Sequence, residues 1–401
     1  MNNVMIGLSG GPSVAINASL AGVMQCASRQ KNMGKIYGAK NGIKGVLDNK
    51  IIDLTNYCDE KNIEILKQTP AMALGSCRYK VKEEDYKKII VVLQKYEIGY
   101  FFYIGGNDSM DTVLKLDNYC KQNNIDIKVV GIPKTVDNDL PVTDHTPGYG
   151  SAAKYLYHTV SEVYRDSIIY PMKNVVIIEA MGRDSGWLTL AAGLPRVLGK
   201  GYPHIVALPE VPFDEIKFIE DVKTMLEEQD LILCVVSEGI KDKDGDYIGS
   251  STKNGKVDTF GHTYLSGVGK YLEMLVNEKI GCKVRSIELS VLQRCASHLA
   301  SKTDIDEAFL IGQKGVSAAL EGNSGITMTY IRESGADYKI KIMTTDVDNI
   351  ANKRKDIPEE WFNLDDENVR KQIKEYLLPL ISGNITQALD ETGLPVYIDI
   401  K

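Results

Sequence analysis

The chain has 401 residues, of which 43% are hydrophobic and 25% are charged, so its composition is that of a soluble globular protein large enough for two domains. A formal net charge of -7 gives no sign of a nucleic-acid partner, and no apolar run approaches the ~20 residues needed to cross a bilayer. Because the seven cysteines are scattered and no signal-peptide pattern begins the chain, we expect a cytoplasmic protein without disulfides, in which an anionic substrate would need a local basic site.

Strand and helix patterns alternate along the chain, and this alternation predicts an α/β fold with parallel sheets. Short apolar runs predict strands at 4–8, 99–104, 128–130, 174–179, 205–208, 231–236 and 284–289. Amphipathic patterns predict helices at 14–27, 82–97, 110–120, 150–166, 188–194, 213–229 and 304–320. The last part of the chain adds a predicted strand pair at 326–331 and 338–344, and a helix at 368–378.

The turn Ser9-Gly10-Gly11-Pro12-Ser13 joins the first predicted strand to the first predicted helix. Free backbone N–H groups and the helix dipole make such a turn a candidate anion site. A turn that only packs the helix closely against the strand is an equally good interpretation. The spacing lacks the G-x-G-x-x-G of a dinucleotide-binding turn, and the chain contains no G-x-x-x-x-G-K-[ST], so a P-loop enzyme is excluded.

Two further loops place polar groups beside glycines. The small-residue loop at 71–79 contains Arg78, whose guanidinium suits a phosphate, although a lone loop arginine is more often a surface charge. The next strand ends at Gly105-Gly106-Asn107-Asp108-Ser109, where a metal or phosphate could be held, or where Asp108 and Ser109 could only stabilise the start of a helix. Three glycine-edged strand ends in one sheet favour a binding site.

The segment Gly131–Leu140 places a dense group of polar side chains directly after the apolar run 128–130. A lysine, a threonine, two aspartates and an asparagine lie within Lys134–Asp139. Open α/β sheets bind their ligands at the carboxyl ends of their strands, where this segment begins. Asp and Asn also favour solvated turns, but this concentration of charge favours a functional site.

These motifs occur together in the order and spacing of the phosphofructokinase family. They are Ser9-Gly10-Gly11, Gly75–Arg78, Gly105–Ser109, Pro133–Asp139 and Met181–Asp184. Over roughly residues 3 to 345 the chain resembles this family, and most of all its pyrophosphate-dependent branch. The resemblance implies two Rossmann-like three-layer α/β domains of the phosphofructokinase fold, with the active site in the interdomain cleft. It also implies reversible phosphoryl transfer to the 1-hydroxyl of fructose 6-phosphate, with Mg2+, to give fructose 1,6-bisphosphate.

The resemblance suggests a division of the chain into domains. We expect a phosphoryl-donor-binding domain at 1–140, completed by about 291–322, and a sugar-phosphate-binding domain at 141–290. Residues 323–401 are expected to form a C-terminal strand pair and helical extension. A homodimer or homotetramer is expected, with one of the arginines that clasp the sugar phosphate supplied by a neighbouring subunit.

The resemblance also implies roles for individual residues. Asp137 matches the general base that takes the proton from the sugar hydroxyl, and Asp139 matches the neighbour that holds the metal or orients the base. Lys134 and Arg183 complete the expected catalytic set. The expected donor-binding residues are Gly11, Arg78, Gly106, Asp108 and Ser109. The expected sugar-phosphate contacts are Thr135, Val136, Asp137, Met181, Gly182, Arg183, Glu238, Arg285, Val291, Leu292, Gln293 and Arg294.

Two positions indicate the phosphoryl donor. In ATP-using members the second turn resembles Gly-Gly-Asp-Gly and the strand-end motif has Gly before Thr, whereas this chain has Asp108 and Lys134 there. The resemblance implies that Asp108 fills and charges the space of the ATP α-phosphate, and that the Lys134 ammonium contacts the donor phosphates. Asn107 replaces a more common aspartate and is the expected Mg2+ contact, through its carbonyl or through water. Val291 replaces a His or Tyr, so one sugar-phosphate contact is lost or supplied elsewhere.

Three other functions fit parts of the pattern. An ATP-dependent phosphofructokinase would keep the fold but would have to tolerate Asp108 and Lys134 beside a nucleotide. A non-catalytic regulatory subunit of the same fold is supported only by Asn107, and the intact aspartates at 137 and 139 argue against it. A NAD-dependent oxidoreductase would need the dinucleotide fingerprint and an acidic residue at the end of the next strand after the Gly-rich first turn, where Lys40 stands.

Overall fold

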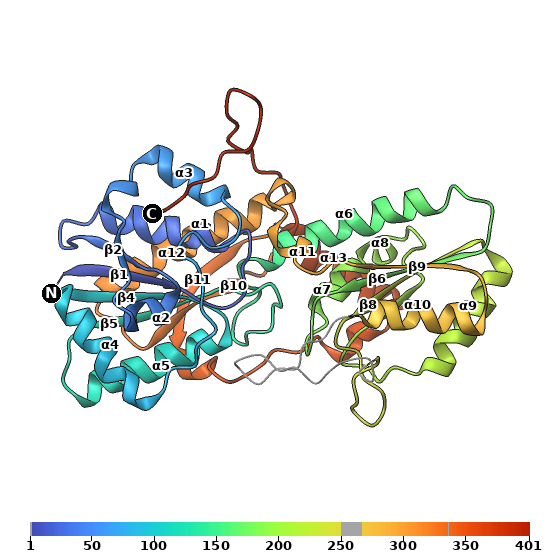
Figure 1. Ribbon diagram of the computed structural model, residues 1–401, viewed down its shortest axis with the longest axis horizontal. Helices are drawn as coiled ribbons and strands as arrows, with labels where there is room; N and C mark the ends of the chain where they lie inside the picture. Colours follow the sequence, from blue (N-terminus) through green and yellow to red (C-terminus); the bar gives the residue numbers. More distant parts are fainter. Residues whose placement is uncertain (1, 250–266, 336) are drawn as a thin grey trace. The chain divides into compact units, whose positions relative to one another are not determined.

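The computed structural model describes residues 2–249, 267–335 and 337–401 (Figure 1). The chain forms two compact units, each assembled from more than one stretch of sequence. Unit 1 comprises Met1–Ser151, Arg294–Lys355 and Ser382–Lys401, and unit 2 comprises Ala152–Gln293 and Asp356–Ile381.

The centre of unit 1 is a seven-stranded sheet. Its strands are β1 (Asn3–Leu8), β2 (Ile36–Ala39), β3 (Ile51–Asp53), β4 (Ile98–Gly105), β5 (Lys128–Pro133), β10 (Ile326–Arg332) and β11 (Ile340–Asp346). They lie in the order β11-β10-β5-β4-β1-β2-β3, with five parallel strands in the middle and an antiparallel strand at each edge. Because β5, β4 and β1 are parallel neighbours, the polar segments that follow them leave the sheet at the same edge.

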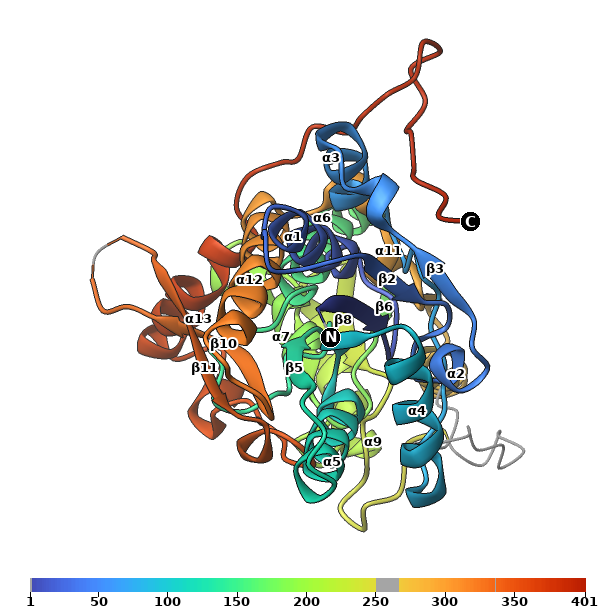
Figure 2. The same ribbon diagram turned by 90° about the vertical axis from the view of Figure 1, so that its left-hand side faces the viewer.

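Helices cover both faces of this sheet (Figure 2). One face packs against α1 (Ile16–Ser28), α3 (Glu60–Gln68) and α12 (Lys302–Leu320), and the other against α2 (Gly42–Leu47), α4 (Glu83–Lys95) and α5 (Asn107–Gln122). Side chains of β1 point alternately to the two faces of the sheet. Val4, Ile6 and Leu8 lie in the core under α1, α3 and α12, and Met5 lies in the core under α2, α4 and α5. A strand that is buried on both faces needs a continuous apolar run, and this is why β1 is visible in the sequence.

Unit 2 is built on a four-stranded parallel sheet in the order β7-β8-β6-β9. The strands are β6 (Asn174–Ala180), β7 (Ile205–Ala207), β8 (Leu231–Ser237) and β9 (Lys283–Glu288). The helices are α6 (Tyr149–Ser167), α7 (Trp187–Ala192), α8 (Leu194–Val197), α9 (Glu215–Glu228), α10 (Val268–Lys279), α11 (Leu292–Cys295) and α13 (Glu367–Leu380). Helix α6 begins in unit 1, and α11 ends there.

The two units also contain short 3-10 helices, which are η1 (Thr55–Tyr57), η3 (Ser297–Leu299), η4 (Val347–Asn349) and η5 (Glu359–Phe362). None of the helices in the described ranges is long and apolar enough to cross a membrane.

The structure divides the last 80 or so residues differently from the expected C-terminal extension at 323–401. The strand pair β10–β11 joins the sheet of unit 1, because Ile326 of β10 pairs in parallel with Val130 of β5. Helix α13 belongs to unit 2, where Trp361 and Tyr376 pack around Trp187 with ring centroids 5.4–5.9 Å apart. The crossings between the units lie at 151, 293, 355 and 381.

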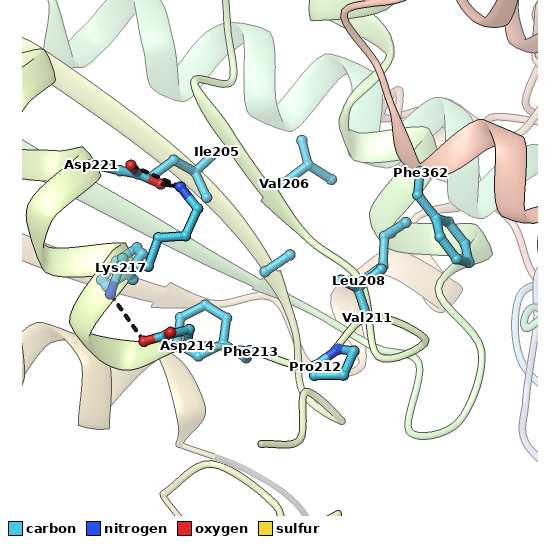
Figure 3. A pocket seen from close by; sticks show the side chains of 12 residues that line it. Ile205, Val206, Leu208, Val211, Pro212, Phe213, Asp214, Lys217, Asp221 and Phe362 are labelled. Carbon is cyan, nitrogen blue, oxygen red and sulfur yellow. Dashed lines mark hydrogen bonds and ion pairs between the residues drawn. The ribbon is translucent and has the colours of Figure 1, made fainter. Parts of the chain in front are cut away.

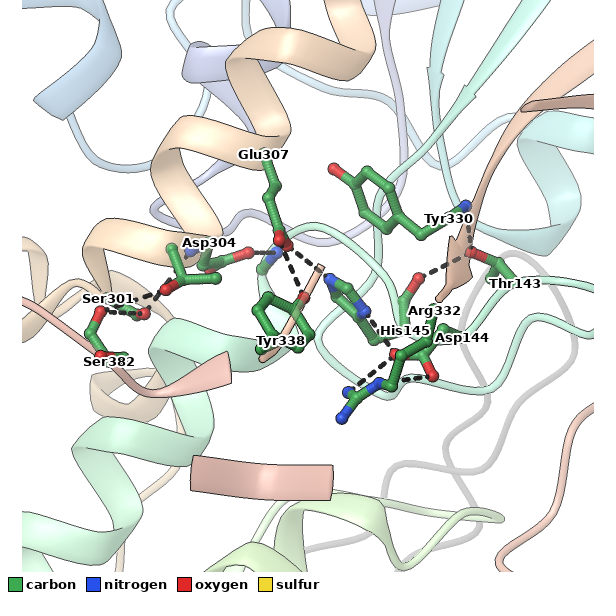
Figure 4. A network of polar contacts seen from close by, with 12 residues as sticks. Thr143, Asp144, His145, Ser301, Asp304, Glu307, Tyr330, Arg332, Tyr338 and Ser382 are labelled. Carbon is green, nitrogen blue, oxygen red and sulfur yellow. Dashed lines mark hydrogen bonds and ion pairs between the residues drawn. The ribbon is translucent and has the colours of Figure 1, made fainter. Parts of the chain in front are cut away.

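A buried polar network links the connection between β5 and α6 to α12 and β10 (Figure 4). His145, which is 2% exposed, hydrogen-bonds Asp144 through Nδ1 at 2.8 Å and Glu307 through Nε2 at 2.7 Å. Arg332 donates to both carboxylate oxygens of Asp144, and the Tyr338 hydroxyl donates to Glu307 at 2.8 Å. Burial alone would lower the pKa of His145, but the two carboxylates outweigh it and raise the pKa. The network therefore connects three elements of unit 1.

We expect the Glu307→Gln substitution to lower the free energy of unfolding by about 3–5 kcal/mol at about pH 6, since it leaves a buried imidazolium with one carboxylate. A pKa that is raised on folding contributes stability below the ordinary value of 6.5, and the contribution is lost as the pH rises through the folded-state pKa. The difference should therefore shrink toward about pH 9 in urea titrations. Glu321→Gln, at the exposed end of α12, is the control. A difference that does not change with pH would contradict this account.

Candidate active site

The carboxyl ends of β1, β4 and β5 bring three predicted motifs together. A Cβ added to Gly10 would lie 3.4 Å from Nζ of Lys134 and 3.9 Å from the backbone nitrogen of Gly106. The Lys134 ammonium donates a 2.6 Å hydrogen bond to the Gly11 carbonyl. A Cβ on Gly11 would lie 3.0 Å from Nη1 of Arg294. The two glycines therefore leave room for two cations to approach the first turn.

Lys134 is an unusual buried cation. Its side chain is 2% exposed, and burial lowers its pKa to about 8, although Asp137 and Asp139 act in the opposite direction. The nearby charge of Arg294 lowers the pKa further. The ammonium stays mostly charged at neutral pH, and an anion bound beside it would be strongly favoured.

The loop that carries Arg78 lies against the first turn. Ser76, for which no role was expected, donates from Oγ to the Gly10 carbonyl at 2.8 Å. Arg78 itself is exposed, so its guanidinium is accessible next to this contact. No local pattern indicates this contact, because the two residues are 66 positions apart in the chain.

The second turn begins helix α5 directly. Asn107, Asp108 and Ser109 form its first residues, and Asp108 is exposed. Ser109 is buried, and a Cβ on Gly105 would lie 2.1 Å from its hydroxyl oxygen, so Gly105 allows this close packing. The Asn107 carbonyl accepts a 2.6 Å bond from the backbone of Asn352, and its amide also donates to the chain there. The expected metal contact thus uses both of its polar atoms within the protein.

The segment Lys134–Asp139 holds two carboxylates close together. Thr135 and Val136, expected to touch the sugar, are 9% and 7% exposed. The Thr135 hydroxyl accepts a 3.1 Å bond from the Asp137 amide, which fixes the turn that presents this carboxylate. Burial and the neighbouring Asp137 charge raise the pKa of Asp139 to about 7. One of the two groups is therefore poised to accept a proton near neutral pH.

The carboxyl ends of β6 and β8 gather four of the expected sugar contacts in unit 2. The Gly182 amide donates to the Glu238 carboxylate at 3.2 Å, and the Met181 amide donates to the Gln293 side chain at 3.2 Å. Gly182 has φ 132°, and a Cβ there would lie 2.3 Å from the Ser185 carbonyl. These contacts fix the backbone that follows β6 in one conformation.

Arg183 emerges from this fixed backbone. Of the buried side-chain atoms in the described part of the chain, its Nε is one of the few without a hydrogen-bond partner. Gly239 packs against the backbone of Arg183, and only a glycine fits there, because a Cβ at position 239 would lie 1.8 Å from the Arg183 carbonyl oxygen. A positioned guanidinium with an unused donor suits an anionic ligand such as a phosphoryl group.

The remaining expected sugar contacts differ in their surroundings. Arg285 is exposed on β9, the edge strand of its sheet, and Val291 and Leu292 are 50% and 54% exposed. Gln293 is 2% exposed, and its side-chain carbonyl accepts the hydrogen bond from the Met181 amide. Arg294, expected with the sugar phosphate, is placed in unit 1 beside the first turn. Its role as a sugar-phosphate ligand stays a prediction.

Asp137 and Asp139 are the two carboxylates of the segment Lys134–Asp139 that could hold a divalent cation. Within the described ranges, no group of three or more His, Cys, Asp and Glu side chains is arranged to hold a metal. The two aspartates raise the cost of each other's charge, and a hard divalent cation with oxygen ligands would relieve it. Asn107 fits this role less well, because its carbonyl oxygen already accepts a backbone hydrogen bond.

A cavity of about 240 Å³ lies elsewhere, between β7 and α9 of unit 2 (Figure 3). Its lining is mostly apolar, with Phe213, Phe218 and Phe362 among the larger side chains. The ion pair between Lys217 and Asp221, at 2.8 Å, lies at its border. None of the expected site residues lines this cavity, and it offers no set of catalytic groups.

Comparison with known proteins agrees with these motifs. The family model described as Phosphofructokinase matches residues 3–319. The pyrophosphate--fructose 6-phosphate 1-phosphotransferase of Xanthomonas campestris pv. campestris is 39% identical over 406 residues, which cover 100% of this chain and 96% of that protein. The protein of the same name from Halomonas elongata is 37% identical over 403 residues, covering 98% and 95%. The crystal structure of a pyrophosphate-dependent phosphofructokinase from Nitrosospira multiformis, 36% identical, matches with a TM-score of 0.88 over 100% of this chain and 96% of that one. The chain therefore belongs to the phosphofructokinase family.

Proposed function

We propose that this phosphofructokinase transfers a phosphoryl group from pyrophosphate to the 1-hydroxyl of fructose 6-phosphate, giving fructose 1,6-bisphosphate and phosphate. Full-length relatives carry the name of this reaction. The observation that carries the proposal is the buried Lys134 ammonium beside Gly11 and Arg294. This arrangement supplies positive charge to the phosphates of a compact donor, against the net negative charge of the chain.

Asp108 supports the choice of donor. Its carboxylate is exposed in the first turn of α5, at the position where ATP-using relatives have glycine. A carboxylate there repels the α-phosphate of a nucleotide and fills part of its space. Pyrophosphate, which ends at its second phosphate, does not need that space.

The residues divide the chemistry between them. Phosphoryl transfer depends mainly on positioning and on neutralising charge on the transferring group. Asp137 takes the proton from the sugar 1-hydroxyl, while Lys134 and Arg183 stabilise negative charge on the phosphoryl group and the leaving phosphate. Glu238 and Arg285 orient the sugar phosphate through its hydroxyl and its 6-phosphate.

A divalent cation completes the proposed site, and we infer that it is Mg2+. Asp139 would hold it, together with phosphate oxygens and water. When bound, it would neutralise charge on the donor phosphates. The enzyme is proposed to act in the cytoplasm as a homodimer or homotetramer, with the exposed β9 edge and Arg285 available to a neighbouring subunit.

We expect Arg285→Ala to raise the KM for fructose 6-phosphate by about 10-fold to 100-fold, because a charge-assisted hydrogen bond contributes about 1.5–3 kcal/mol. The KM for pyrophosphate should change little. Lys283→Ala, which removes an exposed charge two residues away on β9, is the matched control. Equal increases in both KM values would remove Arg285 as a sugar-phosphate ligand.

The reaction itself can be followed by phosphorus NMR with pyrophosphate, fructose 6-phosphate and Mg2+. We expect pyrophosphate to disappear while phosphate and a new sugar-phosphate signal grow at equal rates. The reaction should require both substrates. Loss of pyrophosphate without the sugar would indicate a pyrophosphatase, and no turnover with both would contradict the proposed function.

A further inference from the structure

The residues Asn352–Lys355, here called the 352–355 segment, form the last part of unit 1 before the chain continues into unit 2. One end of the segment is tied to the start of α5. The backbone N–H of Asn352 donates to the Asn107 carbonyl at 2.6 Å, and the Asn107 amide donates to the Lys353 carbonyl. The Asn352 side chain also donates to Asp111 at 2.9 Å. The segment is therefore fixed to the turn that presents Asp108.

The other end of the segment is tied to the residues that follow β5. The Lys355 amide donates to the Asp139 carbonyl at 2.7 Å. Its ammonium donates to the Asp144 carbonyl at 2.9 Å and the Thr143 carbonyl at 3.2 Å, with the Asn138 side chain 3.5 Å away. Burial lowers the pKa of Lys355 to about 8, although the charges of Asp144 and Asp139 partly offset this effect. A half-buried lysine thus holds the backbone that follows Asp137 and Asp139.

The chemistry of Asn107 explains why an amide stands at this position. It has to accept one hydrogen bond from a backbone N–H and donate another to a backbone carbonyl. An ionised aspartate can accept the first but cannot donate the second, and its charge would face the Lys353 carbonyl. The departure from the more common aspartate therefore matches a docking contact better than a metal contact.

We propose that the 352–355 segment is a clasp that fixes the turn of Asp108 and the loop of Asp137 and Asp139 relative to each other, with Asn107 and Lys355 as its positioning residues. The proposal rests on the proposed function in so far as these two parts serve one reaction. Misplacement of reacting groups by about 1 Å can cost about 10²-fold in rate. The clasp therefore controls turnover without touching either substrate.

Hydrogen exchange tests the clasp without any assay of activity. The Lys355→Met substitution removes contacts to 138–144, and we expect faster amide exchange there and also in 105–111, at the other end of the clasp. Asn107→Asp should give the reverse pattern, with faster exchange spreading to 137–144. Lys341→Met, which removes an exposed charge on β11, is the control and should change neither peptide. If each substitution accelerated amide exchange only in the part of the chain that it contacts directly, and not at the other end of the segment, the proposal would be wrong.

Kinetics then test whether the clasp serves the reaction. Asn107→Asp and Lys355→Met should each lower kcat by about 10-fold to 100-fold, with the KM for fructose 6-phosphate within about twofold. The double variant should be no slower than the slower single variant, because either change releases the same segment. Lys355→Arg, which keeps the charge, should recover part of the loss.

Three kinetic outcomes would also overturn the clasp. Multiplicative losses in the double variant would mean that the two residues act independently. An Asn107→Asp enzyme with full kcat and a lower Mg2+ requirement would make this residue a metal ligand. Losses in kcat that follow the folded fraction, measured by circular dichroism, would reduce the segment to a structural role. Asn107 lies partly exposed, so its variant should fold even if Lys355→Met does not. If the wild-type enzyme were inactive with pyrophosphate, the proposed function would be wrong, but the clasp would not be affected. The hydrogen-exchange result would then test the clasp by itself.

Discussion

Replacing Asp137 with asparagine should lower kcat by about 10²–10⁴-fold, the usual contribution of a general base. The substitution keeps the size of the side chain, and residue 137 contributes only its backbone amide to the bond with the Thr135 hydroxyl. The fold and the KM for pyrophosphate should therefore change little. Steady-state rates with pyrophosphate and fructose 6-phosphate, measured together with the melting temperature, check this expectation.

Asp126→Asn is a suitable control for the loss of one carboxylate, because Asp126 is exposed. Its ion pair in the described part of the chain is with Lys128, at 3.0 Å. It should leave kcat within about twofold, as expected of a surface substitution. If the Asp137 variant kept the wild-type kcat, Asp137 would not be the base. Asp139, whose pKa is raised to about 7, would then become the candidate.

Replacing both Asp108 and Lys134 with glycine should exchange one phosphoryl donor for the other. The Lys134 change removes the buried ammonium that lies beside Gly11, so kcat/KM for pyrophosphate should fall by about 10²-fold or more, from one or two lost charge-assisted hydrogen bonds at about 1.5–3 kcal/mol each. The Asp108 change removes the carboxylate that opposes a nucleotide. ATP-dependent phosphorylation of fructose 6-phosphate should then become measurable.

The two single variants separate these contributions. Lys134→Gly alone should lose activity with pyrophosphate without gaining ATP, since the Asp108 carboxylate stays in place. Asp108→Gly alone should keep most of its activity with pyrophosphate. A double variant whose preference between the two donors stays unchanged would show that selectivity lies in other residues.

The sequence located most elements because each is marked by a local pattern. The apolar runs at 174–179 and 231–236 correspond to β6 and β8, which are buried on both faces. The predicted strand at 128–130 was too short. Strand β5 continues to Pro133 because its pairing with β4 continues as far as Gly105.

Contacts between distant parts of the chain could not be predicted in this way. Asn107 and Asn352 are 245 residues apart, and neither is unusual in its local sequence. For the same reason, the sequence predicts one C-terminal extension at 323–401, whereas β10 and β11 complete one sheet and α13 packs in the other unit. Long-range pairing depends on the whole fold, which local periodicity does not encode.

The motifs identified the candidate site but did not distinguish exposed from buried members. Thr135 and Val136 belong to the motif, yet their side chains lie in the interior and support the turn. Ser76 has no expected role within the Gly75–Arg78 motif, and Lys355 lies outside the motifs, yet both hold the loops of the site through backbone carbonyls. Supporting residues of this kind are recognised by their partners rather than by their spacing.

The central claim is that pyrophosphate is the phosphoryl donor, and a direct comparison of donors tests it. The wild-type enzyme should be assayed with saturating fructose 6-phosphate and Mg2+, with pyrophosphate or ATP as the varied substrate. We expect kcat/KM for pyrophosphate to exceed that for ATP by about 10³-fold or more, because two or three charged contacts of about 1.5–3 kcal/mol separate the two donors. An enzyme that used ATP as well as or better than pyrophosphate would contradict the assignment of Lys134 and Asp108.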